Sequence, residues 1–135
     1  MSELTPYLAV HDAAAAIRWY GDHLGAEVVY QPIVMPDGRI GHVELAVDGA
    51  RWMMADEHPE IQFEAPVAGH GSPVTLHLTV ADVDVDAVAG RVAAGGAVLD
   101  REPEDDAVGR MAAFRDPFGH RWLLHQASLG GPTDR

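Results

Sequence analysis

A turn between two apolar strands is predicted by the stretch Phe114-Arg115-Asp116-Pro117-Phe118-Gly119-His120-Arg121-Trp122-Leu123-Leu124-His125. Pro117 fixes φ at the first corner of this turn, and Gly119 tolerates a positive φ at its end. Seventy residues earlier the chain reads Asp48-Gly49-Ala50-Arg51-Trp52, so that a glycine, an arginine and a tryptophan recur at one constant offset. The stretch is therefore a predicted hairpin with a counterpart in the N-terminal half of the chain.

Further identities follow the same offset along the chain. The pairs are Thr5 with Thr75, Leu8 with Leu78, Val10 with Val80, Asp12 with Asp82, Gly25 with Gly95, and Val28 with Val98. These identities stand where a strand, a helix N-cap, a C-cap glycine and a further strand each require such residue types. The sequence therefore predicts two copies of one structural unit.

The composition is typical of one soluble domain that covers residues 1–135. Hydrophobic residues make up 47% of the 135, which is enough for a moderate core. The chain has no cysteine, no charged N-terminus before an apolar run, and no apolar stretch of about 18 residues. We expect a cytoplasmic protein without a membrane partner. The net charge of −12, with nine arginines and no lysine, argues against a nucleic-acid partner and attracts small cations.

The first unit, about 4–55, is expected to contain one helix and four strands. These are strand 5–10, a helix from its N-cap Asp12 to its closing Gly25, and strands 26–31, 40–47 and 51–55. Residues 56–73 hold four acidic residues, three prolines and two glycines, which predicts a linker across the surface.

The second unit, about 74–126, repeats the order of the first. Its expected elements are strand 74–80, a helix from the N-cap Asp82 to about residue 94, strand 97–101, an acidic loop at 102–106, and strands 110–115 and 120–125. Residues 127–135 are predicted to be a tail, disordered from the Gly130-Gly131-Pro132 run onward.

A duplicated β-α-β-β-β unit that ends in Arg115-Asp116-Pro117-Phe118-Gly119-His120-Arg121-Trp122 resembles the vicinal oxygen chelate superfamily, which includes glyoxalase I, bleomycin-resistance proteins and extradiol dioxygenases. Five further segments are most similar to its phosphonate-operon-type, bleomycin-resistance-like branch: Tyr7-Leu8-Ala9-Val10, Arg18-Trp19-Tyr20, Leu24-Gly25-Ala26, Gly41-His42-Val43-Glu44-Leu45 and Leu76-His77-Leu78. Over residues 4–126 the resemblance implies an α+β fold. It also implies that the two tandem units form a curved mixed sheet around one cavity, with the helices outside and often with a second subunit that completes the cavity.

The resemblance also implies where metal ligands stand in the metalloenzymes of this superfamily. The corresponding positions of this sequence are Thr5 and Thr75 on the first strands, and Met53 and Leu123 on the last. None of these side chains is charged or an imidazole, whereas a divalent ion needs about three or four firm nitrogen or oxygen donors. We therefore expect no metal and no other cofactor.

The same positions indicate which residues line the cavity. Because ligand positions face the cavity in the resembling proteins, alternation along the strands directs Tyr7, His77 and His125 inward together with Met53 and Leu123. The alternative for the two histidines is that they are buried and bonded to backbone carbonyls.

The residues His42 and Glu44 are two apart on one predicted strand, so both can point into the same space. Glu44 could act as a carboxylate for a cationic ligand or as a base. The alternative is that this strand face meets solvent. A displaced metal site made of His42, Glu44, His77 and His125 is a further possibility, since four donors from three strands suit a divalent ion.

The other histidines and the tryptophans receive structural predictions. We expect Trp52 and Trp122 to point toward the helices as core residues, and the following histidines at loop or helix-edge positions to be solvated: His11, His23, His58 and His70.

Three functions are compatible with these features. The first is a binding protein, similar to bleomycin-resistance proteins, that holds a small cationic or aromatic molecule in a central cavity without the usual metal centre. The second is a metal-dependent lyase, isomerase or dioxygenase that uses the displaced site. The third is a structural or regulatory dimer without a ligand. A homodimer is expected in any case, because the two units expose sheet edges that a small monomer covers poorly.

Overall fold

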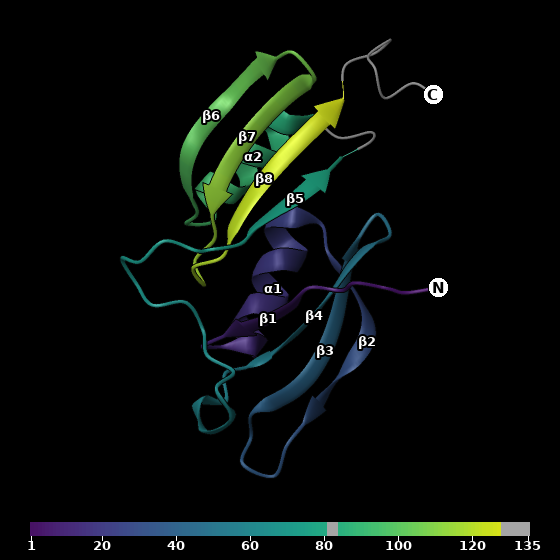
Figure 1. Cartoon of the computed structure of the whole chain (residues 1–135), viewed down its shortest axis with the longest axis vertical. Coiled ribbons are helices and arrows are strands. Elements are labelled where there is room, and N and C mark those ends of the chain that lie inside the picture. Colours follow the sequence, from purple (N-terminus) through teal and green to yellow (C-terminus); the bar gives the residue numbers. More distant parts are fainter. Residues whose placement is uncertain (81–83, 128–135) are drawn as a thin grey trace. The chain divides into compact units, whose positions relative to one another are not determined.

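The computed structural model describes residues 1–80 and 84–127. The chain divides into two compact units, Met1–Ala68 and Gly69–Arg135. Within the described residues, each unit contains one α-helix and a four-stranded mixed sheet in the order β-α-β-β-β (Figure 1). The predicted α+β class and the predicted repetition of this unit are confirmed. A cavity formed jointly by the two sheets stays a prediction.

Unit 1, residues 1–68, contains one helix, four strands and a short 3-10 turn. They are β1 (Tyr7–Val10), α1 (Ala13–Leu24), β2 (Glu27–Val34), β3 (Ile40–Val47), β4 (Ala50–Asp56) and η1 (Pro59–Ile61). The strand order is β1-β4-β3-β2, with β1 parallel to β4 and the other neighbours antiparallel. Every predicted element of this unit is present, with boundaries that differ by a few residues.

The helix α1 begins and ends at the predicted capping residues. Asp12 Oδ1 accepts a hydrogen bond from the main-chain nitrogen of Ala15 at 3.0 Å, which satisfies one of the free donors of the first turn. Gly25 ends the helix with φ of 75°, a left-handed conformation that glycine adopts without a steric cost. These two local signals fix the length of the helix.

The packing of α1 decides which face of the sheet stays open. The ring of Tyr20 meets the ring of Trp52 edge to face, with centroids 5.4 Å apart, and both side chains are buried. Trp52 therefore points toward α1, as predicted. Its neighbour Met53 points to the opposite face, because successive side chains of a strand alternate.

Unit 2, residues 69–135, repeats the arrangement of unit 1 within its described part. Its elements are β5 (Thr75–Thr79), α2 (Val85–Ala94), β6 (Val98–Asp106), β7 (Gly109–Arg115) and β8 (Arg121–Ala127). The strand order is β5-β8-β7-β6, with β5 parallel to β8. The two sheets thus share one topology.

The start of α2 is capped by Asp84, whose carboxylate accepts a hydrogen bond from the main-chain nitrogen of Asp86 at 2.9 Å. Asp82, the predicted N-cap, lies outside the described residues. The predicted tail also lies outside them, except for Ala127, which ends β8. In residues 1–80 and 84–127, neither helix is long and apolar enough to cross a membrane.

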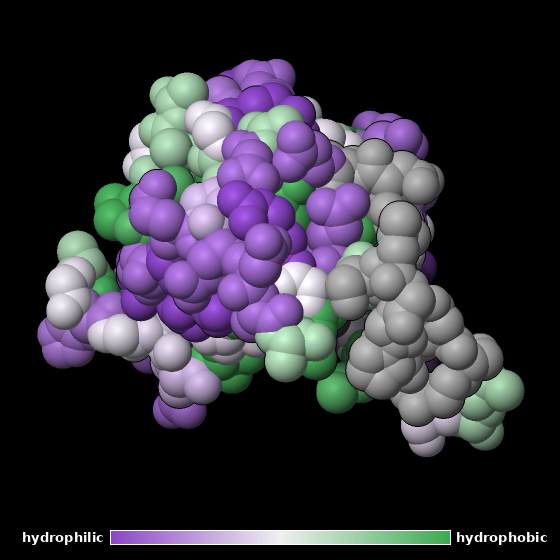
Figure 2. Space-filling model, turned by 90° about the horizontal axis from the view of Figure 1, so that it is seen from above, coloured by the Kyte–Doolittle hydropathy of each residue, from purple (hydrophilic) through white to green (hydrophobic). Residues whose placement is uncertain are grey.

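The acidic segment predicted as a loop, 102–106, is instead part of β6. The ladder continues there because Glu104 pairs with Met111 and Asp106 pairs with Gly109. Arg101 offsets the acidic charge, since its guanidinium lies 2.8 Å from Glu104 and 3.6 Å from Asp106. This strand is an edge of the sheet, where charged side chains are tolerated. Hydrophilic residues dominate the face shown in Figure 2.

The predicted hairpin between β7 and β8 is confirmed. The Asp116 carboxylate holds it together: one oxygen accepts hydrogen bonds from the main-chain nitrogens of Phe118 and His120, at 2.9 and 3.0 Å, and the other accepts one from Trp122 Nε1 at 2.9 Å. Gly119 has φ of 93°, the positive value that the turn requires. The motif is therefore a structural one, and Trp122 is buried as predicted.

Candidate functional site

One side chain from each strand of unit 1 contributes to a row on the sheet face opposite α1. Tyr7 of β1 pairs with Met53 of β4, Met53 pairs with Glu44 of β3, and Glu44 pairs with Tyr30 of β2. Because partners in register share a face, all four point away from α1. The register therefore places Tyr7, Met53 and Glu44 on one face of the sheet, and His42 lies on the same face two residues before Glu44.

The polar side chains on this face form a continuous chain of contacts. Tyr7 Oη lies 2.8 Å from His42 Nδ1, and His42 Nε2 lies 2.8 Å from Glu44 Oε2. The second oxygen of Glu44, Oε1, lies 3.2 Å from Arg51 Nη1, and Arg51 Nη2 lies 3.2 Å from Glu3 Oε1. Five side chains are thus linked from the cavity wall to the protein surface.

The hydrogen-bonding groups of these linked side chains have partners in both protonation states of the His42 ring. A carboxylate only accepts, so the neutral imidazole of His42 donates from Nε2 to Glu44 and accepts the Tyr7 hydroxyl hydrogen at Nδ1. In the imidazolium form Nδ1 donates to Tyr7, and the Tyr7 hydroxyl can donate to the main-chain oxygen of Gly41, 3.3 Å away. A proton can therefore be held at His42 without leaving a donor or acceptor unpaired.

Donors of the protein meet the Glu44 carboxylate. Glu44 is only 8% exposed, and both of its oxygens are met by donors of the protein, so it is not an open carboxylate awaiting a cation. Burial raises the pKa of the Tyr7 phenol, and the nearby Glu44 charge raises this pKa further. Tyr7 is therefore a neutral hydroxyl over a wide range of pH.

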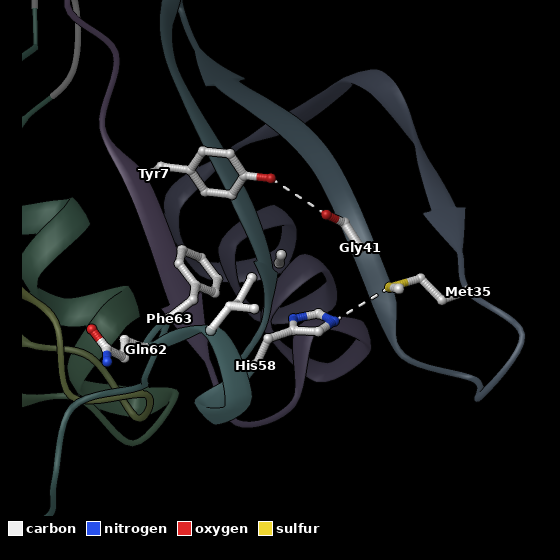
Figure 3. A pocket seen from close by; sticks show the side chains of 8 residues that line it. Tyr7, Met35, Gly41, His58, Gln62 and Phe63 are labelled. Carbon is white, nitrogen blue, oxygen red and sulfur yellow. Dashed lines mark hydrogen bonds between the residues drawn. The ribbon is translucent and has the colours of Figure 1, made fainter.

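A cavity of about 730 Å³ opens on unit 1 beside this row (Figure 3). Its lining is mostly apolar and consists of Tyr7, Met35, Gly41, Ala55, His58, Ile61, Gln62 and Phe63. Tyr7 is the one predicted ligand-binding residue in this lining. The size and apolar character are those of a small-molecule site.

Half of the lining comes from residues 58–63, a segment that was predicted to be part of a linker. The turn η1 begins with Pro59, and Gln62 ends it in a left-handed conformation with φ of 63°. His58 and Phe63 then form an isolated bridge, with main-chain hydrogen bonds of 2.7 and 3.2 Å. The ring of Phe63 meets Tyr7 edge to face at 5.2 Å. The segment thus folds back onto β1 and walls the cavity.

An ion pair holds this segment to the turn before β3. The guanidinium of Arg39 lies 2.8 Å from Glu60 and 2.8 Å from Asp37. The Arg39 hydrogen bond is the largest cause that lowers the pKa of Glu60 to about 2. The pair is exposed, so it positions the segment more than it stabilises the fold.

The prediction that His58 is solvated is wrong. Its side chain is 8% exposed, and its Nδ1 lies 2.7 Å from the main-chain oxygen of Asp56. Asp56 in turn accepts hydrogen bonds of 2.7 Å from the main-chain nitrogens of Ala13 and Ile40. The carboxylate of Asp56 therefore ties the end of β4 to α1 and β3, which places His58 at the cavity.

Sequence reasoning missed four of the lining residues that carry large side chains: Met35, His58, Ile61 and Phe63. A weak signal was present, because Ile61 and Phe63 are two large apolar residues in a segment that is otherwise polar. Met35 had no such signal. Its thioether lies against β3 because Gly41 lacks a Cβ, which would stand 2.9 Å from the Met35 sulfur.

The predicted site residues of unit 2 form contacts within that unit. The rings of His77 and His125 meet at 5.3 Å, and Leu123 is the register neighbour of His77. His125 is 8% exposed and lies 3.1 Å from the main-chain oxygen of Val108, so its Nε2 donates to that carbonyl. This is the alternative that was foreseen for a buried histidine. His77 is exposed.

The side chains at the family's metal-ligand positions do not fit a divalent cation. The hydroxyl of Thr75 accepts a hydrogen bond from the guanidinium of Arg121 at 3.1 Å, which puts a positive charge beside that position. Met53 and Leu123 offer no firm nitrogen or oxygen donor. Residues 1–80 and 84–127 contain no group of three or more histidine, aspartate or glutamate side chains in a metal-binding arrangement.

Comparisons with known proteins agree with this architecture. An uncharacterized protein of Mycobacterium bovis is 39% identical over 127 residues, which are 91% of this chain and 82% of that protein. TioX from Micromonospora sp. ML1 has a TM-score of 0.66 and 25% identity, and the match covers 94% of this chain and 97% of that one. The fosfomycin resistance protein FosX from Mesorhizobium loti shares the fold, with a TM-score of 0.67, 20% identity, and coverage of 95% and 93%.

A sequence model of one family matches residues 4–124, nearly the whole chain. The match contains both described helices and the Asp116 turn, and every described strand begins within it. The chain belongs to the glyoxalase/bleomycin resistance protein/dioxygenase superfamily.

Proposed function

We propose that the protein binds a small aromatic or apolar molecule in the cavity of unit 1, without a metal ion. The observation that carries this proposal is the mostly apolar cavity of about 730 Å³, which lies in the usual range for small-molecule sites. The family includes resistance proteins that bind as well as enzymes that react, so membership alone does not decide between them. Assignment to the phosphonate-operon-type branch stays part of the proposal.

The shape of the lining favours a flat, aromatic ligand. Tyr7 and Phe63 meet at an interplanar angle of 82° and form an aromatic corner. Met35 and Ile61 add flexible and branched apolar surface. A planar ring can stack on one wall of the corner and contact the other with its edge.

Two features predicted a positively charged ligand, the Glu44 carboxylate and the acidic net charge, and the first now gives weaker evidence for it. Glu44, the expected partner of a cation, is already bonded to His42 and Arg51. The net charge of −12 still attracts cations at long range, although salt screens this field beyond about 8 Å. We therefore propose that aromatic shape contributes more to affinity than charge does.

A second candidate function is acid–base catalysis without a metal. It is favoured by the contact between Tyr7, whose hydroxyl reaches the cavity wall, and His42, which can hold a proton. The metal-dependent lyase, isomerase or dioxygenase predicted as the alternative has weaker support, because His42 and Glu44 would have to leave their present partners.

Binding is tested by calorimetric titration with 3-methylindole, a neutral aromatic probe. Ile61→Ser should weaken binding by about three- to tenfold, because it removes apolar surface from the lining. Val67→Ser is the matched control, since Val67 is an exposed apolar residue of the same connecting segment that does not line the cavity. Equal loss in both variants, or no binding to the wild type, would contradict the proposal.

The metal-free state is tested by elemental analysis of protein purified without a histidine tag. We expect far less than one equivalent of zinc, nickel, manganese or iron after gel filtration. One retained equivalent would favour the displaced site instead, and His77→Ala should then release the metal.

We also propose that the protein is a homodimer. The edge strands of unit 1 are β1 and β2, and β2 exposes several large apolar side chains: Val29, Tyr30, Ile33 and Val34. Such an edge pairs readily with another chain. Light scattering at micromolar concentration should give twice the chain mass of 14.5 kDa, and the mass of a single chain would reject the dimer.

A further inference from the structure

The hydrogen on the His58 ring is placed by its surroundings. Nδ1 lies 2.7 Å from the main-chain oxygen of Asp56. A carbonyl oxygen only accepts hydrogen bonds, so Nδ1 carries a hydrogen. In the neutral imidazole the other nitrogen, Nε2, therefore has no hydrogen and presents a lone pair.

Nε2 has no donor among the described residues. It lies 3.3 Å from Met35 Sδ, the contact drawn in Figure 3. A thioether sulfur has no hydrogen, so this contact is a hydrogen bond only when His58 is an imidazolium. In the neutral form, two lone pairs face each other beside the cavity that both residues line.

The nearby carboxylates offer only weak stabilisation to an imidazolium. Hydrogen bonds from Arg39 are the largest cause of the lowered pKa values of Asp37 and Glu60, and His58 is only the last cause. Both carboxylates are exposed and already paired with Arg39. Burial of His58 among apolar side chains opposes the charged form. With Nδ1 bonded to the Asp56 carbonyl, a neutral ring has an unused acceptor at Nε2.

We infer that His58 Nε2 accepts a hydrogen bond from the ligand, so that the cavity selects molecules with an N–H or O–H group on an aromatic body. This inference rests on the proposed function, because it takes the unit 1 cavity as the binding site. A buried acceptor without a donor costs free energy, and a ligand donor relieves that cost. Acceptor-only compounds such as ethers leave the cost in place.

The second polar atom on the cavity wall has the same preference. When His42 is neutral, the Tyr7 hydroxyl directs its hydrogen to His42 Nδ1 and leaves its oxygen lone pairs free. Tyr7 and His58 both line the cavity, and a ligand donor reaches His58 Nε2 when the flexible Met35 side chain turns away from it. A fully matching ligand donates a hydrogen bond to both atoms. A heteroaromatic N–H, a phenol or an arylamine supplies one of these two donors.

The test uses two isomers that differ in one hydrogen-bond donor. 3-Methylindole has a ring N–H, whereas 1-methylindole has the same size and no N–H. Calorimetry at pH 8, where an ordinary imidazole is neutral, should show about tenfold tighter binding of 3-methylindole by the wild type. His58→Asn keeps a donor for Asp56 and removes Nε2, so the preference should fall below about twofold. Met35→Leu, which leaves Nε2 in place, should keep the preference.

Each outcome decides between the inference and the proposed function. Equal binding of both isomers by the wild type leaves the proposed function standing and overturns the inference. A preference that persists in His58→Asn also overturns it. Binding of neither isomer rejects both the function and the inference.

A measurement on the wild type avoids any dependence on the folding of the variants. Long-range proton–nitrogen correlation spectra at pH 8 should show Nε2 of His58 without a hydrogen. This nitrogen should shift when 3-methylindole is added and stay unchanged with 1-methylindole. A protonated Nε2 in the free protein at this pH would overturn the inference.

Discussion

The two units of the chain repeat one topology but place different chemistry on equivalent positions. In unit 1 the row across the sheet consists of Tyr7, Met53, Glu44 and Tyr30, and in unit 2 the equivalent row consists of His77, Leu123, Ala113 and Arg101. The central carboxylate of unit 1 is thus an alanine in unit 2. The common backbone fixes where the side chains stand, and the residue types at those positions decide whether linked polar side chains cross the sheet face.

The connections between the strands differ as well. The β3–β4 turn of unit 1 contains only two residues, Asp48 and Gly49, both with positive φ. The corresponding β7–β8 turn of unit 2 contains five residues, 116–120, and depends on the Asp116 carboxylate. A turn held by backbone conformation and a turn held by a side chain should respond differently to the same mutation. This difference can be measured.

The largest effect is expected from the glycines of the two β-hairpins that follow the helices. Gly109 of unit 2 has φ of 145°, and a Cβ there would overlap the main-chain oxygen of Gln126. Gly109→Ala should therefore lower the free energy of unfolding by about 3 kcal/mol or more. Gly38 of unit 1 has φ of 90° but open space around its Cα, so Gly38→Ala should cost only about 1 kcal/mol. Urea unfolding monitored by circular dichroism compares the two variants, and equal losses would contradict the difference in packing.

The next effect concerns the two turn aspartates. Asp116→Asn keeps the size of the side chain but turns one acceptor into a donor, which faces Trp122 Nε1 or one of the main-chain nitrogens. We expect a loss of about 1 to 3 kcal/mol in the free energy of unfolding. Asp48→Asn should change it by less than about 0.5 kcal/mol, because asparagine tolerates the positive φ of that turn. A small loss at Asp116 would show that its hydrogen bonds are replaceable by water.

A smaller effect is expected on the titration of Tyr7. Its pKa is raised mainly by burial and secondly by the charge of Glu44. Glu44→Gln removes that charge, so the Tyr7 pKa should fall toward the ordinary value of 10.0 while remaining above it. Carbon NMR of labelled tyrosine measures the change. Glu3→Gln is the control, since Glu3 pairs with Arg51, at the end of the linked side chains that is farthest from Tyr7. An unchanged Tyr7 pKa in Glu44→Gln would show that the Glu44 charge does not act on the Tyr7 phenol.

Local chemistry explains which parts of the fold could be predicted from the sequence. Asp12 and Gly25 bond within their own helix ends, and the described hydrogen bonds of the Asp116 carboxylate stay within residues 116–122. Such signals do not depend on distant parts of the chain. The extension of β6 was missed because it depends on pairing with β7 and on the ion pairs of Arg101, which outweigh the loop-like composition of the segment.

The candidate site was predictable only in part for the same reason. Alternation along strands grouped Tyr7 with Met53 and His42 with Glu44, because a period of two needs no knowledge of the partner strand. His58 and Met35 come together only through the loop after β4, whose path depends on Asp56 and on the pair between Arg39 and Glu60. Contacts between segments that are distant in sequence leave no periodic pattern.

The smallest predicted effect tests how that loop, the second wall of the unit 1 cavity, is held in place. The Arg39 hydrogen bond lowers the pKa of Glu60 from 4.5 to about 2 in the folded protein. A carboxyl group with a lowered folded pKa stabilises the fold above its unfolded pKa and loses this contribution as pH falls through the folded value. The contribution of the pair should therefore be complete above about pH 4.5 and disappear near pH 2. Because both side chains are exposed, salt should weaken it.

The measurement is the carboxyl titration of Glu60 by NMR, together with the melting temperature of the wild type and of Glu60→Gln between pH 6 and pH 2. The two melting curves should converge as the pH falls, because protonated Glu60 resembles glutamine in charge. Glu64→Gln is the control, as it removes an exposed carboxylate of the same segment whose side chain has no ion pair with the described arginines. A folded-state titration of Glu60 at the ordinary value of 4.5 would mean that Arg39 does not hold the loop. The wall formed by His58, Ile61 and Phe63 would then depend on the backbone bridge between His58 and Phe63 alone.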